Sequence, residues 1–308
     1  MGTEASVPMS AYVRIPASTS NLGAGFDALS LALDRHLKVS VERAASLRIE
    51  ARGVDQSLIP TTTDNLIYRA ALAAAGMRGR VLPPFLMIIE NQIPLARGMG
   101  SSAAAIIAGI TCYEVLSNDR LNEQDLFRCA FEFESHPDNL AAALFGGLVA
   151  TAVSDNGTVL VSKPVITGRV AGIVVIPSFE LSTETARSVL PQSYSRKDVV
   201  YNIQRSALTI AALTSGDWPM MREAMRDRVH QPYRAKLIPG LEEILSLELD
   251  GLFGIALSGA GPTVFAFADP DHTDTVGRAI AGIFKQHGVD ATSQLVNIDR
   301  SGRLVEES

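Results

Sequence analysis

One glycine-rich stretch separates a strand-like run from a helix-like run: Ile93-Pro-Leu-Ala-Arg-Gly-Met-Gly-Ser-Ser-Ala-Ala-Ala105, between apolar residues 85–89 and helix-favouring residues 104–116. Gly98 and Gly100 permit a backbone with positive φ or a close approach to a ligand. Ser101 and Ser102 stand where the helix begins, and the free backbone N–H groups and the helix dipole there attract anions. The stretch therefore predicts a phosphate-binding loop, with an N-capped helix after a flexible loop as the plainer alternative.

Two better-known nucleotide motifs do not explain this stretch. A Walker loop requires a lysine followed by serine or threonine directly after its last glycine, and no lysine lies here. The spacing Gly98-x-Gly100-x-x-Ala103 matches the dinucleotide-binding pattern in form. That pattern follows its strand directly, however, whereas residues 90–97 intervene here. A Rossmann-type fold is therefore the weaker alternative.

Composition limits the classes of protein to which the sequence can belong. The chain has 308 residues, of which 47% are hydrophobic, enough for one large domain or two ordinary ones. A net charge of −6 argues against nucleic acid as the main partner. Cys112 and Cys129 both lie in helix-like runs, so we expect buried thiols in a reducing compartment and no disulfide.

We expect neither a membrane span nor a secretion signal. No apolar run reaches about 18 residues, and the N-terminus lacks a basic region followed by an apolar core. Residues 1–6 fit the myristoylation pattern, but no polybasic segment accompanies them. The expected protein is a cytoplasmic enzyme.

Hydrophobic patterning predicts an α+β protein with a domain boundary near Gly168, which gives domains 1–168 and 169–308. In the first domain we expect strands at 12–15, 37–42, 47–51 and 85–89, helices at 65–75, 104–116, 122–134 and 140–144, and a hairpin at 148–162. In the second we expect strands at 172–176, 253–257, 264–268 and 294–298, and helices at 182–191, 195–214, 218–229, 241–248 and 273–287. The segment 230–240 reads as an extended loop, and the helices are expected on one face of the sheet.

The loop expected after the first strand, residues 16–27, is rich in small, hydroxylated and glycine residues. Asn21 and Asp27 are its polar side chains best able to reach a small polar substrate. Local capping or turn hydrogen bonds are the competing explanation, and for Asn21 the two are equally good.

A second polar cluster, residues 132–139, surrounds a helix break that Pro137 imposes. We interpret Asp138 as the cap of the next helix, and Glu134 and His136 as site candidates because they lie in the break. One histidine with scattered carboxylates does not make a zinc site. A single carboxylate, a serine hydroxyl and phosphate oxygens would suit Mg²⁺.

Three glycine-rich stretches, residues 16–27, 94–104 and 258–263, together resemble the GHMP kinase superfamily. The phosphate loop of that superfamily reads Pro-x-x-x-Gly-Leu-Gly-Ser-Ser-Ala, and Met99 replaces the leucine here. Within the superfamily the chain is similar to the homoserine kinases, in four segments spread over residues 12–268. These are Pro16-Ala-Ser-Thr-Ser-Asn-Leu-Gly-Ala-Gly-Phe-Asp27, His136-Pro-Asp-Asn139 before Gly146-Gly147, Thr183-x-x-x-Arg187-x-x-Leu-Pro191 and Arg234-x-x-Leu-Ile-Pro-Gly240.

This resemblance implies a two-domain fold, with an N-terminal domain like domain 2 of ribosomal protein S5 and a ferredoxin-like C-terminal domain. It implies ATP-dependent phosphorylation of the side-chain hydroxyl of L-homoserine to O-phospho-L-homoserine, on the way to threonine. Mg²⁺ would be held by Ser102 and Glu134. Homoserine would be surrounded by Asn21, Asp27, His136, Asn139, Thr183, Arg187 and Arg234. ATP would lie against Pro94, Leu95, Ala96, Arg97, Gly98, Met99, Gly100, Ser101, Ser102, Ala103 and Ala104.

The resemblance also bears on catalysis. Asn139 stands where mevalonate-type relatives place an aspartate base, and an amide cannot abstract a proton. Phosphoryl transfer depends mostly on positioning and charge stabilisation, so we expect Asn139 to orient the hydroxyl while the γ-phosphate takes its proton. His136 as a general base ranks second. A GHMP kinase for another small alcohol and a non-catalytic ligand sensor are the alternative functions, and a homodimer is expected from the family.

Overall fold

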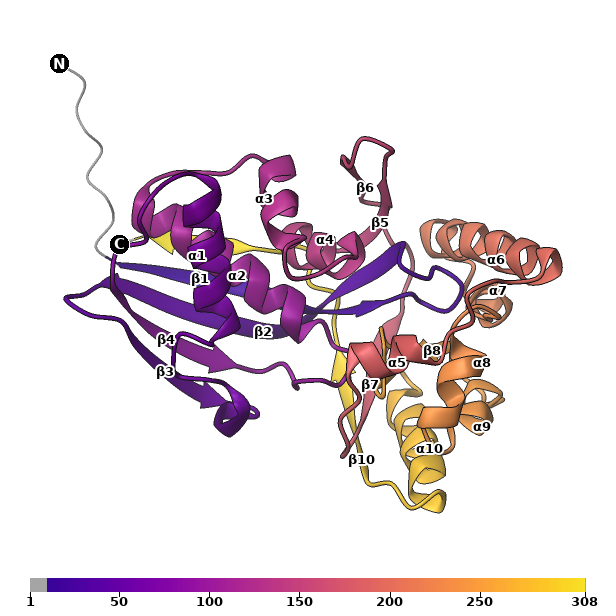
Figure 1. The fold of residues 1–308 in the computed structure, drawn as a ribbon. Coiled ribbons are helices and arrows are strands. Elements are labelled where there is room, and N and C mark those ends of the chain that lie inside the picture. Colours follow the sequence, from indigo (N-terminus) through magenta and orange to yellow (C-terminus); the bar gives the residue numbers. More distant parts are fainter. Residues whose placement is uncertain (1–9, 308) are drawn as a thin grey trace.

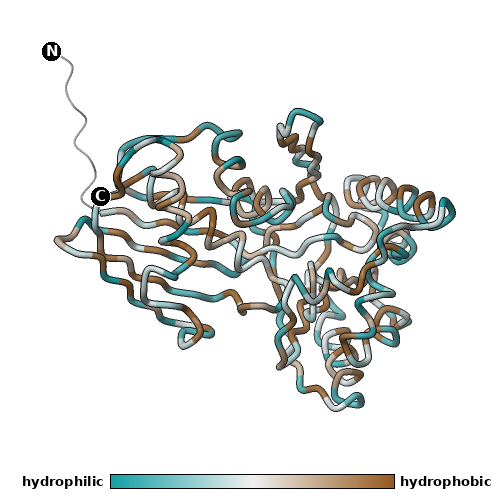
Figure 2. Tube along the Cα trace, in the orientation of Figure 1, coloured by the Kyte–Doolittle hydropathy of each residue, from teal (hydrophilic) through white to brown (hydrophobic). Residues whose placement is uncertain are grey.

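The computed structural model describes residues 10–307, which form two β-sheets with helices packed against each (Figure 1). The myristoylation pattern at residues 1–6 lies outside the described residues. Within the described part, none of the helices combines the length and the apolar character that a membrane crossing requires. Along the strands, hydrophobic and hydrophilic residues alternate in many places, as expected where one face of a sheet is buried (Figure 2).

The first sheet has seven strands among residues 10–307: β1 (Ser10–Ser20), β2 (Leu29–Arg43), β3 (Arg48–Gly53), β4 (Phe85–Asn91), β5 (Leu148–Val153), β6 (Val159–Ser162) and β11 (Leu304–Glu307). Its order is β11-β1-β2-β4-β3, with the β5–β6 hairpin attached to β2. The hairpin prediction is confirmed. The prediction that residues 16–20 form a loop is wrong, because these residues continue β1 and pair with β2 after a register shift at Pro16/Ala17.

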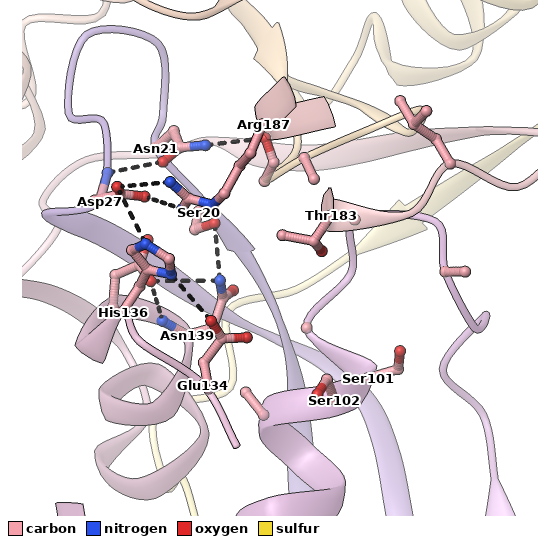
Figure 3. Close-up of a pocket in the computed structure, with 18 of the residues that line it drawn as sticks. Ser20, Asn21, Asp27, Ser101, Ser102, Glu134, His136, Asn139, Thr183 and Arg187 are labelled. Carbon is pink, nitrogen blue, oxygen red and sulfur yellow. Dashed lines mark hydrogen bonds and ion pairs between the residues drawn. The ribbon is translucent and has the colours of Figure 1, made fainter. Parts of the chain in front are cut away.

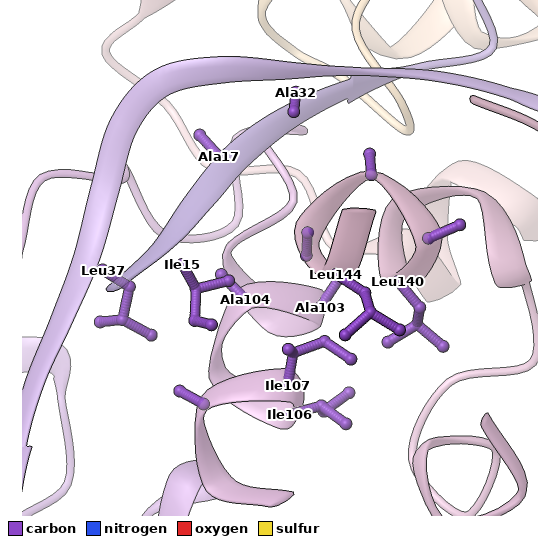
Figure 4. Close-up of a cluster of buried hydrophobic side chains, with 14 of the residues drawn as sticks. Ile15, Ala17, Ala32, Leu37, Ala103, Ala104, Ile106, Ile107, Leu140 and Leu144 are labelled. Carbon is purple, nitrogen blue, oxygen red and sulfur yellow. The ribbon is translucent and has the colours of Figure 1, made fainter. Parts of the chain in front are cut away.

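Four helices lie on one side of this sheet: α1 (Leu66–Met77), α2 (Ser101–Ser117), α3 (Glu123–Ala130) and α4 (Pro137–Phe145) (Figure 1). Figure 4 shows the core that they close, in which Ile15, Ala32, Ile107 and Leu140 come from β1, β2, α2 and α4. Helix α2 is the centre of this layer, and its small residues allow close packing. A Cβ added at Gly109 would stand 2.2 Å from the Ile67 carbonyl oxygen of α1.

Two helix starts differ from the prediction. Helix α1 begins at Leu66 rather than at Asn65, because Asn65 caps it by accepting hydrogen bonds from the N–H groups of Ile67 and Tyr68. Helix α4 begins at Pro137, which is suited to a first helical position because it has no N–H to lose. Asp138 therefore lies inside the first turn, and its interpretation as a cap is wrong.

The second sheet is antiparallel, with strands β7 (Ala171–Pro177), β8 (Leu252–Leu257), β9 (Val264–Ala268) and β10 (Ala291–Val296) in the order β10-β7-β9-β8. Helices α9 (Leu241–Leu245) and α10 (Thr273–Gln286) pack on one face, and α6 (Arg196–Ser215) and α7 (Trp218–Ala224) pack at the other. The expectation of helices on one face is wrong, because successive residues of β7 are buried on both faces. Trp218 of α7 stacks on Phe253 at 5.8 Å between ring centroids.

Short helical elements connect these layers: η1 (Gln56–Leu58), α5 (Thr183–Ser188), α8 (Gln231–Arg234) and η2 (Ala235–Leu237). Residues 230–240 are thus not the extended loop that was predicted. The Asp227 carboxylate accepts hydrogen bonds from the N–H groups of Val229, His230 and Gln231, which starts the helical turn. The domain boundary near Gly168 stays a prediction, and β11 returns the chain to the first sheet beyond it.

Candidate active site

A cavity of about 340 Å³ lies where the three glycine-rich stretches meet (Figure 3). It is lined by fourteen of the residues singled out from the sequence: Asn21, Asp27, Ala96, Gly98, Gly100, Ser101, Ser102, Ala103, Glu134, His136, Asn139, Thr183, Arg187 and Arg234. The lining also contains Ser20, Asp138, Leu181, Ser182, Gly259 and Ala260. Residues from six stretches of the chain, between positions 20 and 260, therefore share one site.

Five residues of the proposed ATP loop do not line this cavity. Met99 and Ala104 are buried in the core, and the Arg97 guanidinium lies 3.1 Å from the Asp55 carboxylate. Leu95 lines a neighbouring pocket instead. Pro94 precedes the turns that lead into α2. These residues hold the loop in shape, and their contact with ATP stays a prediction.

The loop reaches α2 through left-handed backbone, with φ of 52° at Ala96, 75° at Gly98 and 70° at Gly100. Helix α2 then begins at Ser101 without a side-chain cap, and its first N–H groups have no partner inside the helix. The residues of this first turn line the cavity, where an anion would be stabilised by free N–H groups and by the helix dipole.

The two glycines serve the protein's own packing. A Cβ at Gly100 would stand 2.1 Å from the Ser18 hydroxyl of β1, and one at Gly98 would stand 2.2 Å from the Ser258 carbonyl oxygen. The sequence explains Gly100 by a close approach of the backbone to a ligand, but a side chain here would meet the protein itself before any ligand. The first collision is with β1, because the loop lies directly on that strand.

Asn21 is buried and links two of the glycine-rich stretches. Its amide nitrogen donates to the Gly259 carbonyl at 2.9 Å, and its amide oxygen accepts from the Asp27 N–H at 3.0 Å. The competing explanation, local hydrogen bonding, accounts for the bond with Asp27 but not for the bond to Gly259, which is 238 positions away. Its contact with a substrate stays a prediction.

Asp27 and Arg187 form a two-pronged ion pair, with Nη2 and Nη1 of the arginine 2.7 and 3.2 Å from the carboxylate oxygens (Figure 3). The Arg187 Nε is buried without a hydrogen-bond partner among the described residues. His136 joins this cluster, since its Nε2 lies 3.5 Å from Asp27 and its Nδ1 lies 3.0 Å from the Glu134 carboxylate. In this cluster the carboxylates of Glu134 and Asp27 thus alternate with the His136 ring and the Arg187 guanidinium.

Arg234 is 1% exposed, although the sequence had suggested an arginine on an extended loop. Its Nε donates to the Ala186 carbonyl at 3.1 Å and its Nη1 to the Gly259 carbonyl at 3.0 Å. Burial, followed by the nearby charge of Arg187, lowers the pKa of Arg234 to about 10. The guanidinium is therefore still a cation at neutral pH.

The Asn139 amide lies between two serines of β1. The Ser18 hydroxyl donates to its oxygen at 2.8 Å, and its nitrogen donates to the Ser20 hydroxyl at 3.0 Å. Neighbouring Asp138 is 2% exposed and accepts from the Asn139 N–H at 2.8 Å. Burial raises the pKa of Asp138 to about 7. These serine contacts could not be predicted from the sequence, because they join residues more than a hundred positions apart.

A second, more apolar pocket of about 230 Å³ shares Ser101 and Ser102 with the cavity. It is lined by Leu37, Leu58, Ile59, Pro60, Asn65, Leu66, Ile67, Ile89, Asn91, Leu95 and Ala105. Sequence reasoning missed this pocket. The only feature of the sequence that points to this pocket is the apolar run 58–60 after β3. Such a short run between two predicted elements looks like an ordinary loop.

Comparison with known proteins places this geometry in a class. The GHMP kinases N terminal domain matches residues 65–147 and the GHMP kinases C terminal domain matches residues 209–286, together more than half of the chain. The chain is a GHMP kinase, and the two-domain fold expected from the sequence is confirmed. Galactokinase of Lactococcus lactis in complex with galactose shares this fold, with a TM-score of 0.70 at 14% identity, over 97% of this chain and 95% of that one.

Closer relatives narrow the class. The homoserine kinase of Solibacter usitatus is 42% identical over 277 residues, 90% of this chain and 91% of its own length. That of Desulfitobacterium hafniense is 39% identical over 95% of this chain and 99% of its own. The crystal structure of homoserine kinase from Cytophaga hutchinsonii has a TM-score of 0.84 at 24% identity, over 99% and 100% of the two chains. The chain belongs to the homoserine kinase family.

Proposed function

We propose that this kinase transfers the γ-phosphoryl group of ATP to the side-chain hydroxyl of L-homoserine, giving O-phospho-L-homoserine on the way to threonine. The observation that carries the proposal is that a single cavity combines a helix N-terminus with two arginines and three carboxyl side chains. Phosphate and a zwitterionic amino acid each find groups of the opposite charge there. The relatives named homoserine kinases, which span nearly the whole chain, support the same substrate.

The phosphates would lie at the start of α2. N–H groups of residues 98–102 can donate to phosphate oxygens, and in a partly closed site such bonds stabilise the charge that develops during transfer. The apolar pocket beside Ser101 and Ser102 suits a nucleobase, since it borders the same serines. ATP would thus bridge the pocket and the cavity.

The residues present fit Mg²⁺. The Ser102 hydroxyl and the Glu134 carboxylate line the same cavity and are hard oxygen donors, which this ion prefers. In the described part of the chain, no group of three or more His, Cys, Asp or Glu side chains could hold a metal ion. When bound, the ion would neutralise charge on the phosphates. Glu134 is kept in place by His136 and by the Ser135 N–H, 3.1 Å from its carboxylate.

Homoserine would bind as a zwitterion between opposite charges. Its carboxylate would contact Arg187 and Arg234, and its ammonium group would contact Asp27, which balances Arg187 in the structure. Asn139, held by Ser18 and Ser20, would orient the hydroxyl without taking its proton. The γ-phosphate would accept that proton late in the transfer, and His136 as a base stays the second choice.

A coupled ADP-release assay over homoserine, mevalonate, shikimate and galactose tests the proposal. Preferential turnover of homoserine is expected. Turnover of another alcohol would point to a different GHMP kinase, and no turnover of any substrate would favour a ligand sensor. We also propose a homodimer from the family, to be tested by the mass in solution from light scattering.

A further inference from the structure

Phe26, in the first glycine-rich stretch, contacts three charged or polar groups at once. The central guanidinium carbons of Arg187 and Arg234 each lie 5.4 Å from its ring centroid. The His230 ring stacks on it at 5.0 Å, with an angle of 20° between the planes. An aromatic face attracts cations, so this ring offsets part of the repulsion between two arginines that face one cavity.

His230 is fully buried, and its contacts determine its tautomer. Its Nε2 lies 2.8 Å from the Gly23 carbonyl oxygen, which can only accept, so Nε2 carries the proton. Its Nδ1 lies 3.2 Å from Nη1 of Arg234, which can only donate, so Nδ1 offers its lone pair. Both contacts are satisfied only by a neutral imidazole.

The surroundings of His230 favour that neutral form. Burial lowers the pKa of His230, and the Arg234 charge acts in the same direction, while Asp227 and Asp27 oppose it. The Asp227 carboxylate is 3.6 Å from Nε2, beyond hydrogen-bond reach, and is occupied by the backbone turn and by the Asn202 amide at 2.6 Å. Asp227 therefore fixes the position of the ring without binding its proton.

Arg234 is consequently held on three sides, by the Ala186 carbonyl at Nε and by the Gly259 carbonyl and His230 at Nη1. Its remaining amino group, Nη2, is left for the cavity that Arg234 lines. A guanidinium held in this way loses little freedom on binding a carboxylate.

We propose that His230 and Phe26 are positioning residues, which fix the Arg234 guanidinium so that it presents Nη2 to the carboxylate of an amino-acid substrate. The inference rests on the proposed function and adds to it two residues that need not touch substrate. It also names the atom through which His230 acts, the unprotonated Nδ1.

Two substitutions at one position separate the two nitrogens of the ring. In His230→Asn the amide oxygen can take the place of Nδ1 and still accept from Arg234, whereas His230→Gln places its amide near Nε2 and keeps only the bond to Gly23. We expect the KM for homoserine of the asparagine variant to stay within about threefold of the wild-type value. The KM for homoserine of the glutamine variant should rise at least tenfold. The KM for ATP should stay within about threefold in both. His287→Asn, at an exposed histidine paired with Glu243, is the matched control.

The outcomes distinguish the explanations. Equal homoserine KM values for the two variants, or a larger rise in the asparagine variant, would overturn the role of Nδ1. A parallel rise in KM for ATP would indicate general disruption and also overturn it. A wild-type protein that turns over no homoserine would reject the proposed function together with this inference, whereas an active wild type with equal variants rejects the inference alone.

Two further measurements cover the case in which both variants fail to fold. Long-range ¹H–¹⁵N NMR of the wild-type protein at pH 7, with five histidines to assign, should show His230 neutral and protonated at Nε2. An imidazolium or an Nδ1-protonated ring would refute the inference. Phe26→Leu should raise the homoserine KM severalfold, with ATP affinity kept, and an unchanged KM would exclude the ring's contribution.

Discussion

Replacing Arg234 with lysine tests the proposed contact with the substrate carboxylate at the arginine whose guanidinium is most constrained by the protein. Arg234 is almost fully buried and binds two backbone carbonyls through different nitrogens while facing the cavity. A lysine ammonium carries all its donors at one point, so it cannot reach the Ala186 and Gly259 carbonyls and a substrate together. At least one charge-assisted contact is lost.

The magnitude follows from the size of such a contact. A hydrogen bond to a charged group is worth roughly 1.5–3 kcal/mol, which corresponds to about 10- to 150-fold in kcat/KM for homoserine. An unsatisfied buried carbonyl should also cost roughly 1–3 kcal/mol of folding free energy. Arg187→Lys should show a loss in kcat/KM of similar size, because its fork is matched to the Asp27 carboxylate.

The assay is coupled ADP release at saturating ATP, with homoserine and the decarboxylated analogue 3-aminopropanol as acceptors. The wild-type kcat/KM for the analogue should be low. It should fall little further in Arg234→Lys, because the analogue has no carboxylate for Arg234 to contact. Arg169→Lys, at an exposed ion pair with Asp271, serves as the control. Full homoserine kcat/KM in Arg234→Lys, or an equally steep loss with both acceptors, would refute the carboxylate contact.

Three other changes have defined outcomes. Glu134→Gln should lower Mg²⁺-dependent kcat by several orders of magnitude, since a metal-bound charge in a partly closed site contributes several kcal/mol, and near wild-type turnover by the folded variant would contradict the metal assignment. Gly100→Val should abolish binding of a fluorescent ATP analogue, because the valine side chain would push the loop away from Ser18. Gly157→Ala should leave this binding unchanged, since no atom lies within 4 Å of the added Cβ. Equal affinities of the two variants for the analogue would count against the prediction. Asp138→Asn should stabilise the fold at pH 8 by on the order of 4 kcal/mol, because burial raises the pKa of Asp138 from 3.8 to about 7 and the native state favours the neutral acid. The neutral Asp138 side chain stabilises the native state below its unfolded pKa, and this stability is lost as the pH rises through about 7. In urea unfolding, the free energy of unfolding of the variant should therefore exceed that of wild type by less at pH 5 than at pH 8. The same difference at both pH values would be inconsistent with the raised pKa.

Local signals predicted much of the fold. Helices α5 and α6 begin where they were expected, because Ser182 and Ser195 cap them and each hydroxyl accepts from an N–H only three residues further on. The sequence Asp155-Asn-Gly157 formed the hairpin turn between β5 and β6 for the same reason. Features that depend only on neighbours in the chain can be recognised in the chain.

Features that depend on distant partners were missed. Residues 16–20 are small and polar and resemble a loop, yet β2 and the α2 layer bury them, so they extend β1. The turn at 230–237 depends on hydrogen bonds to the Asp227 carboxylate. No sequence pattern around Asp227 indicated that its side chain would start a turn. Strand β11 was not expected, because four residues carry too little alternation to stand out.

The candidate site divides in the same way. Fourteen of the residues drawn from the family motifs line one cavity, which patterning of this single sequence could not establish. Their partners were not foreseen: Ser18 and Ser20 around Asn139, and Phe26 beneath the two arginines. Motifs identify the side chains that face a ligand, whereas the residues that orient them are recognisable only after the chain has folded.

The pairing of β11 with β1 makes the second sheet an insertion within the first. The polypeptide passes between the halves twice, once after β6 and once before β11. A single proteolytic cut near Gly168 would therefore not release an intact N-terminal half, since its edge strand would remain on the other fragment. During synthesis on the ribosome, one edge of β1 likewise stays open until residues 304–307 emerge, and an open edge is where strands of other chains can attach.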